Sequence, residues 1–410
     1  MEKNTLFFII LAILVVQYLV HQYLEYLNAK RFKSTLPPEL SDVFDEDEYQ
    51  KSQRYKRTNY KFGVISDGFS LVLTICFLSF GGFEWVDQLT RSITDKPIPM
   101  ALVFFGIIML GSSILGLPFS YYRTFVIEEQ YGFNKTTKST FLSDKIKGGI
   151  LTIILGGGIL TLFMLFYQST GPIFWVYAWA MVAIIILFIN LFYSRLIVPL
   201  FNKQTPLQDG SLKSSIENYA QKVGFELQNI FVIDGSKRST KANAYFSGFG
   251  KEKRITLFDT LINDLSEDEI VAVLAHEVGH YKKKHIIVNL IVSLLTTGLT
   301  LFILSLFINN PKISLAIGVS TPSFHAALVG FALLYSPISE ITGLVMNYLS
   351  RKFEFQADDF AKTTFAATPL VSSLKKLSKK SLSNLTPHPA YVFVHYSHPP
   401  LVERIQNLKA

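Results

Sequence analysis

The stretch Ala275-His276-Glu277-Val278-Gly279-His280 contains two histidines that are four residues apart. On a helix, four residues overshoot one turn by only about 40°, so both imidazoles project from nearly the same face and can share one metal ion. Glu277 lies next to that face, where its carboxylate can polarise a zinc-bound water and later deliver its proton. Gly279 is expected to leave space beside the metal. The stretch therefore indicates a hydrolytic zinc site on a helix.

A capping box marks the start of this helix. Ser266 is a natural N-cap, and Glu269 follows three residues later, where it can bond back to the Ser266 backbone. The region before it, from about 202, is polar and contains two strand-like stretches, 229–233 and 254–258. We expect the region from about 202 to 285 to be the catalytic part, with a small β-sheet.

Apolar runs of about twenty residues precede and follow this region, and each is near the length that a membrane-spanning helix needs. The runs cover residues 6–24, 63–83, 100–119, 149–167, 172–194, 286–308 and 324–349. We therefore predict a mostly α-helical, polytopic membrane protein with about seven transmembrane helices. The expected division is an N-terminal membrane domain with five spans, 1–201, and a zinc metallopeptidase domain with two further spans, 202–410.

The composition fits a membrane protein that carries polar domains, because 49% of the 410 residues are apolar. The formal net charge is +8, but the basic residues collect beside the apolar runs, so we expect no nucleic-acid partner. Lys and Arg are concentrated in the first and third connections, which predicts an external or lumenal N-terminus and a cytosolic active site. The single cysteine, Cys76, excludes a cysteine cluster and leaves histidine and carboxylate as metal ligands.

A third metal ligand must come from elsewhere in the chain, since a hydrolytic zinc ion takes three protein ligands and keeps one position open. Glu354, which follows the seventh apolar run, is the best candidate. Asp358 shares its helical face and could hydrogen bond the free ring nitrogen of a ligating histidine. On spacing alone, we would favour the alternative that both acids lie at the surface and pair with Arg351 and Lys352.

Three other polar residues need an explanation. His285 is nine residues from His276, about 900° along one continuous helix, so we expect it on the opposite face and not at the metal. Asp67 and Glu340 lie inside apolar runs, where a carboxylate is costly unless it faces water or a partner. A water-filled chamber and helix–helix hydrogen bonding are both open explanations for these two acids.

Five motifs, taken together and in order, resemble those of the integral-membrane CAAX prenyl protease 1 family. They are Phe125-Val126-Ile127-Glu128-Glu129-x-x-Gly132-Phe133-Asn134, Asn243-Ala244-Tyr245-Phe246, His276-Glu277-x-x-His280, Phe353-Glu354-Phe355-Gln356-Ala357-Asp358 and Ser397-His398-Pro399-Pro400-Leu401-x-Glu403-Arg404. The resemblance runs from about residue 50 to 406. It implies a chambered barrel of seven membrane helices with a gluzincin-type site, in which His276, His280 and Glu354 bind Zn²⁺ and Glu277 is the general base.

The same resemblance implies roles for residues outside the metal site. Asn243 and Ala244 would lie on an edge strand that pairs with an extended substrate. His398 would donate to the tetrahedral oxyanion, and Arg404 would hold nearby acids in place. From the residues alone, His398 would be a turn residue before two prolines, and Asn243 a strand-end turn.

The activity implied by the resemblance is that of a membrane-embedded zinc endopeptidase, similar to the protease that removes the C-terminal tripeptide of prenylated CAAX proteins. Its substrate would be a peptide or protein, prenylated or not, met at the bilayer. The segment Gln406 to Ala410 has no lysine-based retrieval signal, which is compatible with a bacterial inner-membrane homologue as well as a eukaryotic ER-type membrane. The alternatives are a quality-control metalloprotease with non-prenylated substrates and a non-catalytic metal-binding membrane protein.

Overall fold

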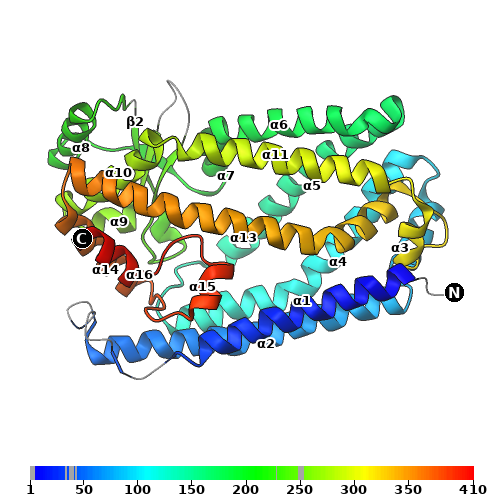
Figure 1. Cartoon of the computed structure of the whole chain (residues 1–410), viewed down its shortest axis with the longest axis horizontal. Coiled ribbons are helices and arrows are strands. Elements are labelled where there is room, and N and C mark those ends of the chain that lie inside the picture. The colour runs from blue at the N-terminus through cyan, green and yellow to red at the C-terminus, as the bar shows by residue number, and fades with distance from the viewer. Residues whose placement is uncertain (1–4, 33–34, 37–40, 42–43, 228, 248–253) are drawn as a thin grey trace.

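The computed structural model describes residues 5–32, 35–36, 41, 44–227, 229–247 and 254–410. Long helices run side by side along the longest axis of the molecule, and the strands and several short helices gather at one end of them (Figure 1). The described start of the chain, on α1 (Thr5–Ala29), lies at the opposite end. The polar region and the membrane helices therefore form two parts along one axis.

The first half of the chain is almost entirely helical. Its elements after α1 are α2 (Glu46–Ser79), α3 (Gly82–Ile93), α4 (Pro97–Tyr122), η2 (Arg123–Glu128), α5 (Lys138–Thr170), η3 (Gly171–Ile173), α6 (Phe174–Phe192), η4 (Tyr193–Ile197) and α7 (Val198–Phe201). Asp45 and Thr137 cap α2 and α5 by accepting hydrogen bonds from backbone N–H groups of the first helical turn.

Six helical segments in the described part of the chain are long and apolar enough to cross a membrane. One of them, Lys138–Phe201, has 64 residues and would measure about 96 Å if it were straight, roughly three times the hydrocarbon thickness of a bilayer. The turn η3 folds it in two, and α5 and α6 pack against each other. The seven apolar helices expected from the sequence are thus all present.

The second half of the chain contains the sheet and the remaining helices. Its elements are β1 (Gln204–Pro206), α8 (Ser211–Lys222), β2 (Asn229–Ile233), η5 (Gly235–Lys237), β3 (Ala244–Ser247), β4 (Arg254–Phe258), α9 (Asp259–Asp264), α10 (Glu267–Lys282), α11 (His285–Phe307), α12 (Pro311–Ala316), α13 (Phe324–Thr364), α14 (Ala367–Lys380), α15 (Pro389–His395) and α16 (Leu401–Lys409). The two strands expected from the sequence are β2 and β4.

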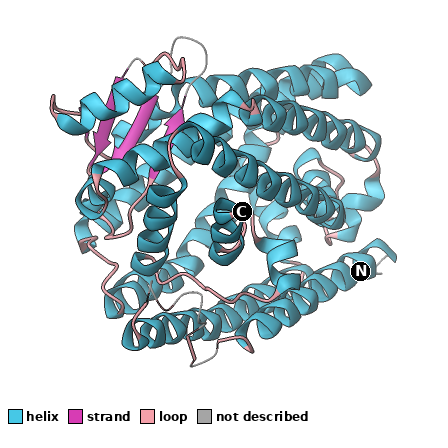
Figure 2. Ribbon diagram, turned by 60° about the vertical axis from the view of Figure 1, so that its left-hand side comes forward, coloured by secondary structure: helices cyan, strands magenta, loops and turns pink. Residues whose placement is uncertain are grey.

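The four described strands form a mixed sheet at one corner of the molecule (Figure 2). Their order is β1-β2-β4-β3, with β2 parallel to β4 and the outer strands antiparallel to their neighbours. Ile255 and Leu257 of β4 belong to the same buried core as Val271 and Ala275 of α10. The sheet therefore supports the helix that carries the two histidines and leaves β3 at its edge.

The helix α13 reaches well beyond the membrane zone. With 41 residues, α13 is about 62 Å long, whereas about 30 Å of helix crosses the hydrocarbon core. The last turns of α13, which carry Glu354 and Asp358, therefore extend to the sheet end of the molecule and pack against α10. One continuous helix thus connects the membrane part to the polar part.

The long helices are arranged as a barrel (Figure 2), and cavities lie between them. Asp67 lines a cavity of 400 Å³ and also lies 3.3 Å from the side-chain nitrogen of Gln22 and 3.4 Å from Nε2 of His21, both on α1. Glu340 lines a separate cavity of 770 Å³ between α5, α11 and α13. Asp67 thus lies at a cavity and also contacts a neighbouring helix, and Glu340 lies at a cavity.

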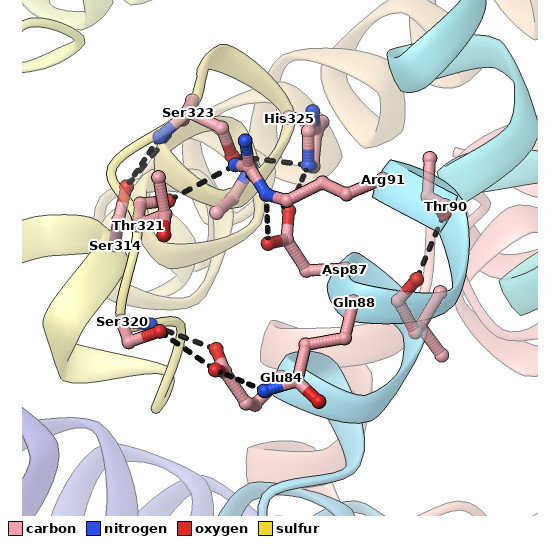
Figure 3. Close-up of polar contacts among 12 residues, drawn as sticks. Glu84, Asp87, Gln88, Thr90, Arg91, Ser314, Ser320, Thr321, Ser323 and His325 are labelled. Carbon is pink, nitrogen blue, oxygen red and sulfur yellow. Dashed lines mark hydrogen bonds and ion pairs between the residues drawn. The ribbon is translucent and has the colours of Figure 1, made fainter. Parts of the chain in front are cut away.

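A buried polar cluster holds the end of the barrel that lies away from the sheet (Figure 3). Oδ1 of Asp87 on α3 lies 2.6 Å from Nε2 of His325, and Arg91 Nε donates to Oδ2 of the same carboxylate at 2.6 Å. Glu84 accepts hydrogen bonds from the backbone and the hydroxyl of Ser320. These contacts fasten α3 to the start of α13.

Candidate metal centre

The helix α10 begins as its sequence predicts. The backbone N–H of Ser266 donates to Glu269 at 2.8 Å, and Ser266 Oγ accepts from the backbone of Glu269, which completes the capping box. The buried Glu269 carboxylate also accepts from Ser372 and Lys376 of α14. Burial opposes its ionisation, but these hydrogen bonds outweigh burial and lower the pKa of Glu269. The N-terminus of the histidine helix is thereby fixed to α14.

His276, His280 and Glu354 come together as one group of possible metal ligands. The two Nε2 atoms lie 3.2 Å apart, and they lie 3.5 Å and 3.3 Å from the carboxylate oxygens of Glu354. A tetrahedral zinc ion with bonds of about 2.0–2.1 Å places its ligand atoms about 3.3–3.4 Å apart. The three side chains are therefore spaced as zinc requires.

The chemistry of Glu354 also fits a metal. Its side chain is 5% exposed, and Oε2 makes no hydrogen bond among the described residues, although Nη1 of Arg404 lies 3.3 Å from it. A buried carboxylate is costly unless it is fully paired, and a metal ion would supply the coordination that Arg404 does not. The surface alternative considered for Glu354 and Asp358 is wrong, because both residues are buried.

A network behind His276 holds its imidazole. Nδ1 of His276 lies 2.8 Å from Oδ1 of Asp358, and Arg404 on α16 donates to both oxygens of that carboxylate. Burial opposes protonation of His276, but hydrogen bonds to Asp358 and Glu354 outweigh it and raise its pKa to about 9. A metal ion that binds here must displace that proton. The network turns Nε2 toward His280 and Glu354.

The expectation for Gly279 was wrong. A Cβ atom at this position would lie 3.0 Å from Cα and 3.1 Å from the carbonyl oxygen of Ala357. Gly279 therefore allows α10 and α13 to approach closely, and it makes no space at the metal. This close approach is what brings Glu354 beside the two histidines.

The expectation for His285 was wrong about its position. The helix α10 ends at Lys282, Lys284 adopts a left-handed conformation with φ of 61°, and a new helix starts at His285. Nδ1 of His285 consequently lies 3.0 Å from Nδ1 of His280, and its Nε2 lies 2.8 Å from Oε1 of Gln356. His285 is therefore placed behind His280 much as Asp358 is placed behind His276.

The sequence offered one signal for this break, which the periodicity argument missed. The polar stretch Lys282-Lys283-Lys284 is followed directly by an apolar run, so the helix before it and the helix after it face different surroundings. The angle of about 900° between His276 and His285 applies only if both residues belong to one continuous helix. Gln356 was missed for a different reason, since only the tertiary structure brings it to His285.

Two candidate catalytic residues border the ligand group. Glu277 is half-buried on α10 and makes no hydrogen bond to any described residue, so its carboxylate is available to a water molecule. Nε2 of His398 lies 3.3 Å from Oε1 of Glu354, and 65% of the His398 side chain is exposed. The loop between α15 and α16 therefore presents an accessible imidazole beside the metal ligands.

Asn243 and Ala244 lie where a substrate strand could pair. Ala244 begins the edge strand β3, whose inner side pairs with β4, and β3 contacts α10. Asn243 is exposed, and its side-chain oxygen accepts a hydrogen bond from the Ala244 backbone. Within the described residues, no strand pairs with the outer side of β3. This open edge next to the histidine helix can accept an extended peptide.

The loop before β3 is fastened to the membrane part. Lys241 donates to Glu128 at 2.8 Å and to the Tyr55 hydroxyl at 3.2 Å, while Tyr55 donates to Glu128 at 2.6 Å. Glu128 belongs to η2, and Tyr55 to α2. The motif around Glu128 thus positions the loop that leads into the edge strand.

Family models match nearly the whole chain. Residues 25–203 match the model described as CAAX prenyl protease N-terminal, five membrane helices, and residues 206–410 match the model described as Peptidase family M48. The two matches together include every candidate site residue.

Curated relatives agree with the family models. The chain is 37% identical over 408 residues to a CAAX prenyl protease 1 homolog of Arabidopsis thaliana, covering 97% of this chain and 96% of the relative. It is 37% identical over 421 residues to CAAX prenyl protease 1 of Saccharomyces cerevisiae, covering 96% and 93%. It is 34% identical over 440 residues to a Homo sapiens homolog, again covering 96% and 93%.

A solved structure has the same fold. The crystal structure of S. mikatae Ste24p superposes with a TM-score of 0.94 at 35% sequence identity, and the match covers 100% of both chains. The sequence likeness and the structural likeness extend over the same membrane helices, sheet and histidine helix. The chain therefore belongs to peptidase family M48, within the CAAX prenyl protease 1 group, and is a multi-pass integral-membrane metalloendopeptidase.

Proposed function

We propose that this protein is a zinc endopeptidase in which His276, His280 and Glu354 bind the metal. The observation that carries the proposal is the spacing of their ligand atoms, 3.2 to 3.5 Å, together with the buried Oε2 of Glu354. When bound, zinc supplies Lewis-acid polarisation of the scissile carbonyl and lowers the pKa of water. The donor set of two imidazoles and one carboxylate suits this metal.

The residues around the ligands have separate roles in proton transfer, oxyanion stabilisation and positioning. Glu277 takes a proton from the attacking water and delivers it to the leaving amine, as a general base and then a general acid. His398 donates a hydrogen bond to the carbonyl oxygen as negative charge develops on it. Asp358 and Arg404 are positioning residues, because they hold His276 and do not reach the substrate.

The substrate enters as an extended strand. Its backbone pairs with the outer side of β3 at Asn243 and Ala244, which carries the scissile bond past the histidine helix. The names of the relatives indicate C-terminal CAAX segments of prenylated proteins as the substrate class. We propose the same class for this chain, with hydrolysis releasing the C-terminal tripeptide.

The site faces the cytosol in this proposal, and the N-terminus is external or lumenal. The concentration of Lys and Arg in the first and third connections supports this orientation, since such residues stay on the cytosolic side. The basic residues thus serve topology and not nucleic-acid binding. We place the division between the membrane domain and the metallopeptidase domain at residues 201 and 202. The membrane is a bacterial inner membrane or a eukaryotic ER-type membrane.

Metal analysis combined with peptide cleavage tests the proposal. The purified protein should contain zinc in equimolar amount and cleave a farnesylated CAAX peptide, and the Glu277→Gln variant should keep the zinc and lose cleavage. Equal cleavage of the farnesylated peptide and its unmodified counterpart would instead favour a protease with non-prenylated substrates. A zinc-loaded protein that cleaves neither peptide would contradict the proposed substrate class.

A further inference from the structure

A cavity lies beside the candidate metal centre, on the side of His398 and Arg404. Its volume is 370 Å³, and His398 and Arg404 line it at the site while Lys56 of α2 lines it elsewhere. A second cavity, of 400 Å³, shares Lys56, Asn384 and Tyr396 with the first. Lys56 therefore lies where the two cavities meet, and it shares a cavity with the group beside the scissile bond.

In the described part of the chain, the first cavity is lined by basic residues and by no acidic ones. Among the described residues, no Asp or Glu lines it, and both Lys56 and Arg404 do. Arg404 is already paired with Asp358 at 2.6 Å and with Glu354 at 3.3 Å. The net positive charge that remains for a ligand is therefore that of Lys56.

Lys56 is not paired with an acid in the part of the chain that the structure describes. Its ammonium makes no hydrogen bond or ion pair there, and its nearest ring, that of Tyr55, has its centroid 5.4 Å away. Glu128, a nearby acid whose charge acts on Lys56, is already held by Lys241 at 2.8 Å. A half-buried ammonium without an anionic partner is the kind of group that binds an anionic ligand.

The acids that share a cavity with Lys56 are Glu25 and Asp67, and both line the second cavity and not the first. Tyr396 lines both cavities beside Lys56, and burial, with the nearby Glu25, raises its pKa to about 12. Its phenol is therefore neutral at physiological pH. The side chain of Asn384 is also neutral and donates to Asn28. An anion is therefore expected to reach Lys56 from the first cavity, where it meets this ammonium beside the neutral Tyr396 and Asn384, and not from the second cavity, where Glu25 and Asp67 would repel it.

We propose that Lys56 binds the C-terminal carboxylate of the substrate and so selects peptide bonds close to a free chain end. This inference rests on the proposed function, in which the leaving fragment is a C-terminal tripeptide. An extended tripeptide spans at most about 10–11 Å, and the cavity that Lys56 and His398 both line is the space in which such a fragment would lie. A charge-assisted hydrogen bond from Lys56 then recognises the C-terminal carboxylate of the substrate.

Binding of short peptides provides a test that needs no cleavage. The probes are an aliphatic tripeptide with a free carboxylate and the same tripeptide as its C-terminal amide, titrated into the zinc-loaded protein in detergent. We expect the acid to bind about ten- to a hundred-fold more tightly than the amide, the range for a hydrogen bond to a charged group. Lys56→Met should abolish this preference, and Lys56→Arg should keep most of it.

Arg54→Met is the matched control, because Arg54 is an exposed cation on the same helix and lines neither cavity. It should leave the acid-to-amide ratio unchanged. Equal binding of acid and amide by the unmodified protein, or an unchanged ratio in Lys56→Met, would overturn the proposal. So would a ratio that falls equally in Arg54→Met, since that would make the effect one of general surface charge.

Cleavage assays separate this inference from the proposed function. If farnesylated acid and amide peptides are cleaved equally well, and Lys56→Met changes neither rate, the protease assignment stands and the carboxylate subsite fails. If no CAAX peptide is cleaved but the binding preference still depends on Lys56, the subsite stands and the substrate class fails. The expected result is a loss of kcat/KM in Lys56→Met for the acid peptide alone.

Discussion

Nδ1 of His276 lies 2.8 Å from Oδ1 of Asp358, and both residues are buried. Asp358 is one helical turn beyond Glu354 on α13, so one helix supplies a candidate ligand and the acceptor that orients another ligand. Arg404 completes the arrangement from α16 by donating to both oxygens of Asp358. The direction of the His276 ring therefore depends on three separate helices.

Replacing Asp358 by Asn should weaken metal binding without removing a ligand. The neutral amide is a weaker acceptor for the imidazole N–H and leaves Arg404 partly unpaired, so we expect about a 10- to 100-fold loss of zinc affinity. Competition with a chelator of known affinity measures the zinc affinity of the variant. Asp359→Asn, at the exposed neighbouring position, is the control and should retain the original affinity. Equal affinities in the two variants would show that Asp358 does not act through the metal site.

Replacing Glu277 by Gln should separate catalysis from metal binding. The glutamine cannot accept the proton of the attacking water, so peptide hydrolysis should fall by at least about 10²- to 10⁴-fold. Zinc content should not change, because Glu277 is not one of the clustered ligand residues. His276→Ala, His280→Ala and Glu354→Ala should lose both zinc and activity. Zinc loss in Glu277→Gln as large as that in His276→Ala would contradict the division of roles.

The features that the sequence predicted well are local ones. The spacing of His276 and His280, the capping box at Ser266 and the lengths of the apolar runs depend on a single helix and its surroundings. Helical periodicity and bilayer thickness are sufficient to interpret them. The strands β2 and β4 were equally accessible, because each is a short apolar stretch bounded by polar residues.

The features that the sequence could not predict arise where distant segments meet. Gly279 allows a close approach to Ala357, and nothing near Gly279 in the sequence identifies that neighbour. The position of His285 depends on the left-handed Lys284, a backbone conformation that a non-glycine residue adopts only when its surroundings impose it. Lys56 lies far from His398 in the chain, and only the tertiary structure brings both into the lining of one cavity.

Reporter fusions should reveal the orientation proposed from the charge pattern. Fusions after about residues 40, 210 and 410 should report the cytosol, and a fusion after about residue 315, in the connection between α11 and α13, should report the opposite side. This outcome also requires that α5 and α6 cross the membrane separately. A cytosolic signal at 315 would mean that α11 does not cross the membrane.

The stability of the histidine helix should depend on pH through Glu269. Because the folded-state pKa of Glu269 is lowered, its contribution is present above the unfolded-state pKa of about 4.3 and is lost as the pH falls through the folded-state value. Glu269→Gln should lower stability by about 1–3 kcal/mol at neutral pH, with the lower end favoured because Lys376 is half-exposed.

Thermal unfolding of the detergent-solubilised protein measures this effect. The difference between the unmodified protein and Glu269→Gln should shrink as the pH is lowered below about 4, since the carboxylate is then protonated in both states. Asp268→Asn is the control, because its side chain is exposed on the same helical turn. A difference that is independent of pH would indicate a packing effect of the substitution.

Replacing His398 by Ala tests whether its hydrogen bond forms mainly in the transition state. His398 lies 3.3 Å from Glu354 on a loop that follows α15, and its side chain is largely exposed, so its loss should leave the ligand group and the zinc content intact. Removal of one oxyanion donor typically lowers turnover by about 10²- to 10³-fold. An interaction made only in the transition state lowers kcat and kcat/KM equally and leaves KM nearly unchanged. We therefore expect His398→Ala to show that pattern with a farnesylated peptide. A raised KM with an unchanged kcat would make His398 a substrate-positioning residue, and loss of zinc would make it part of the metal site.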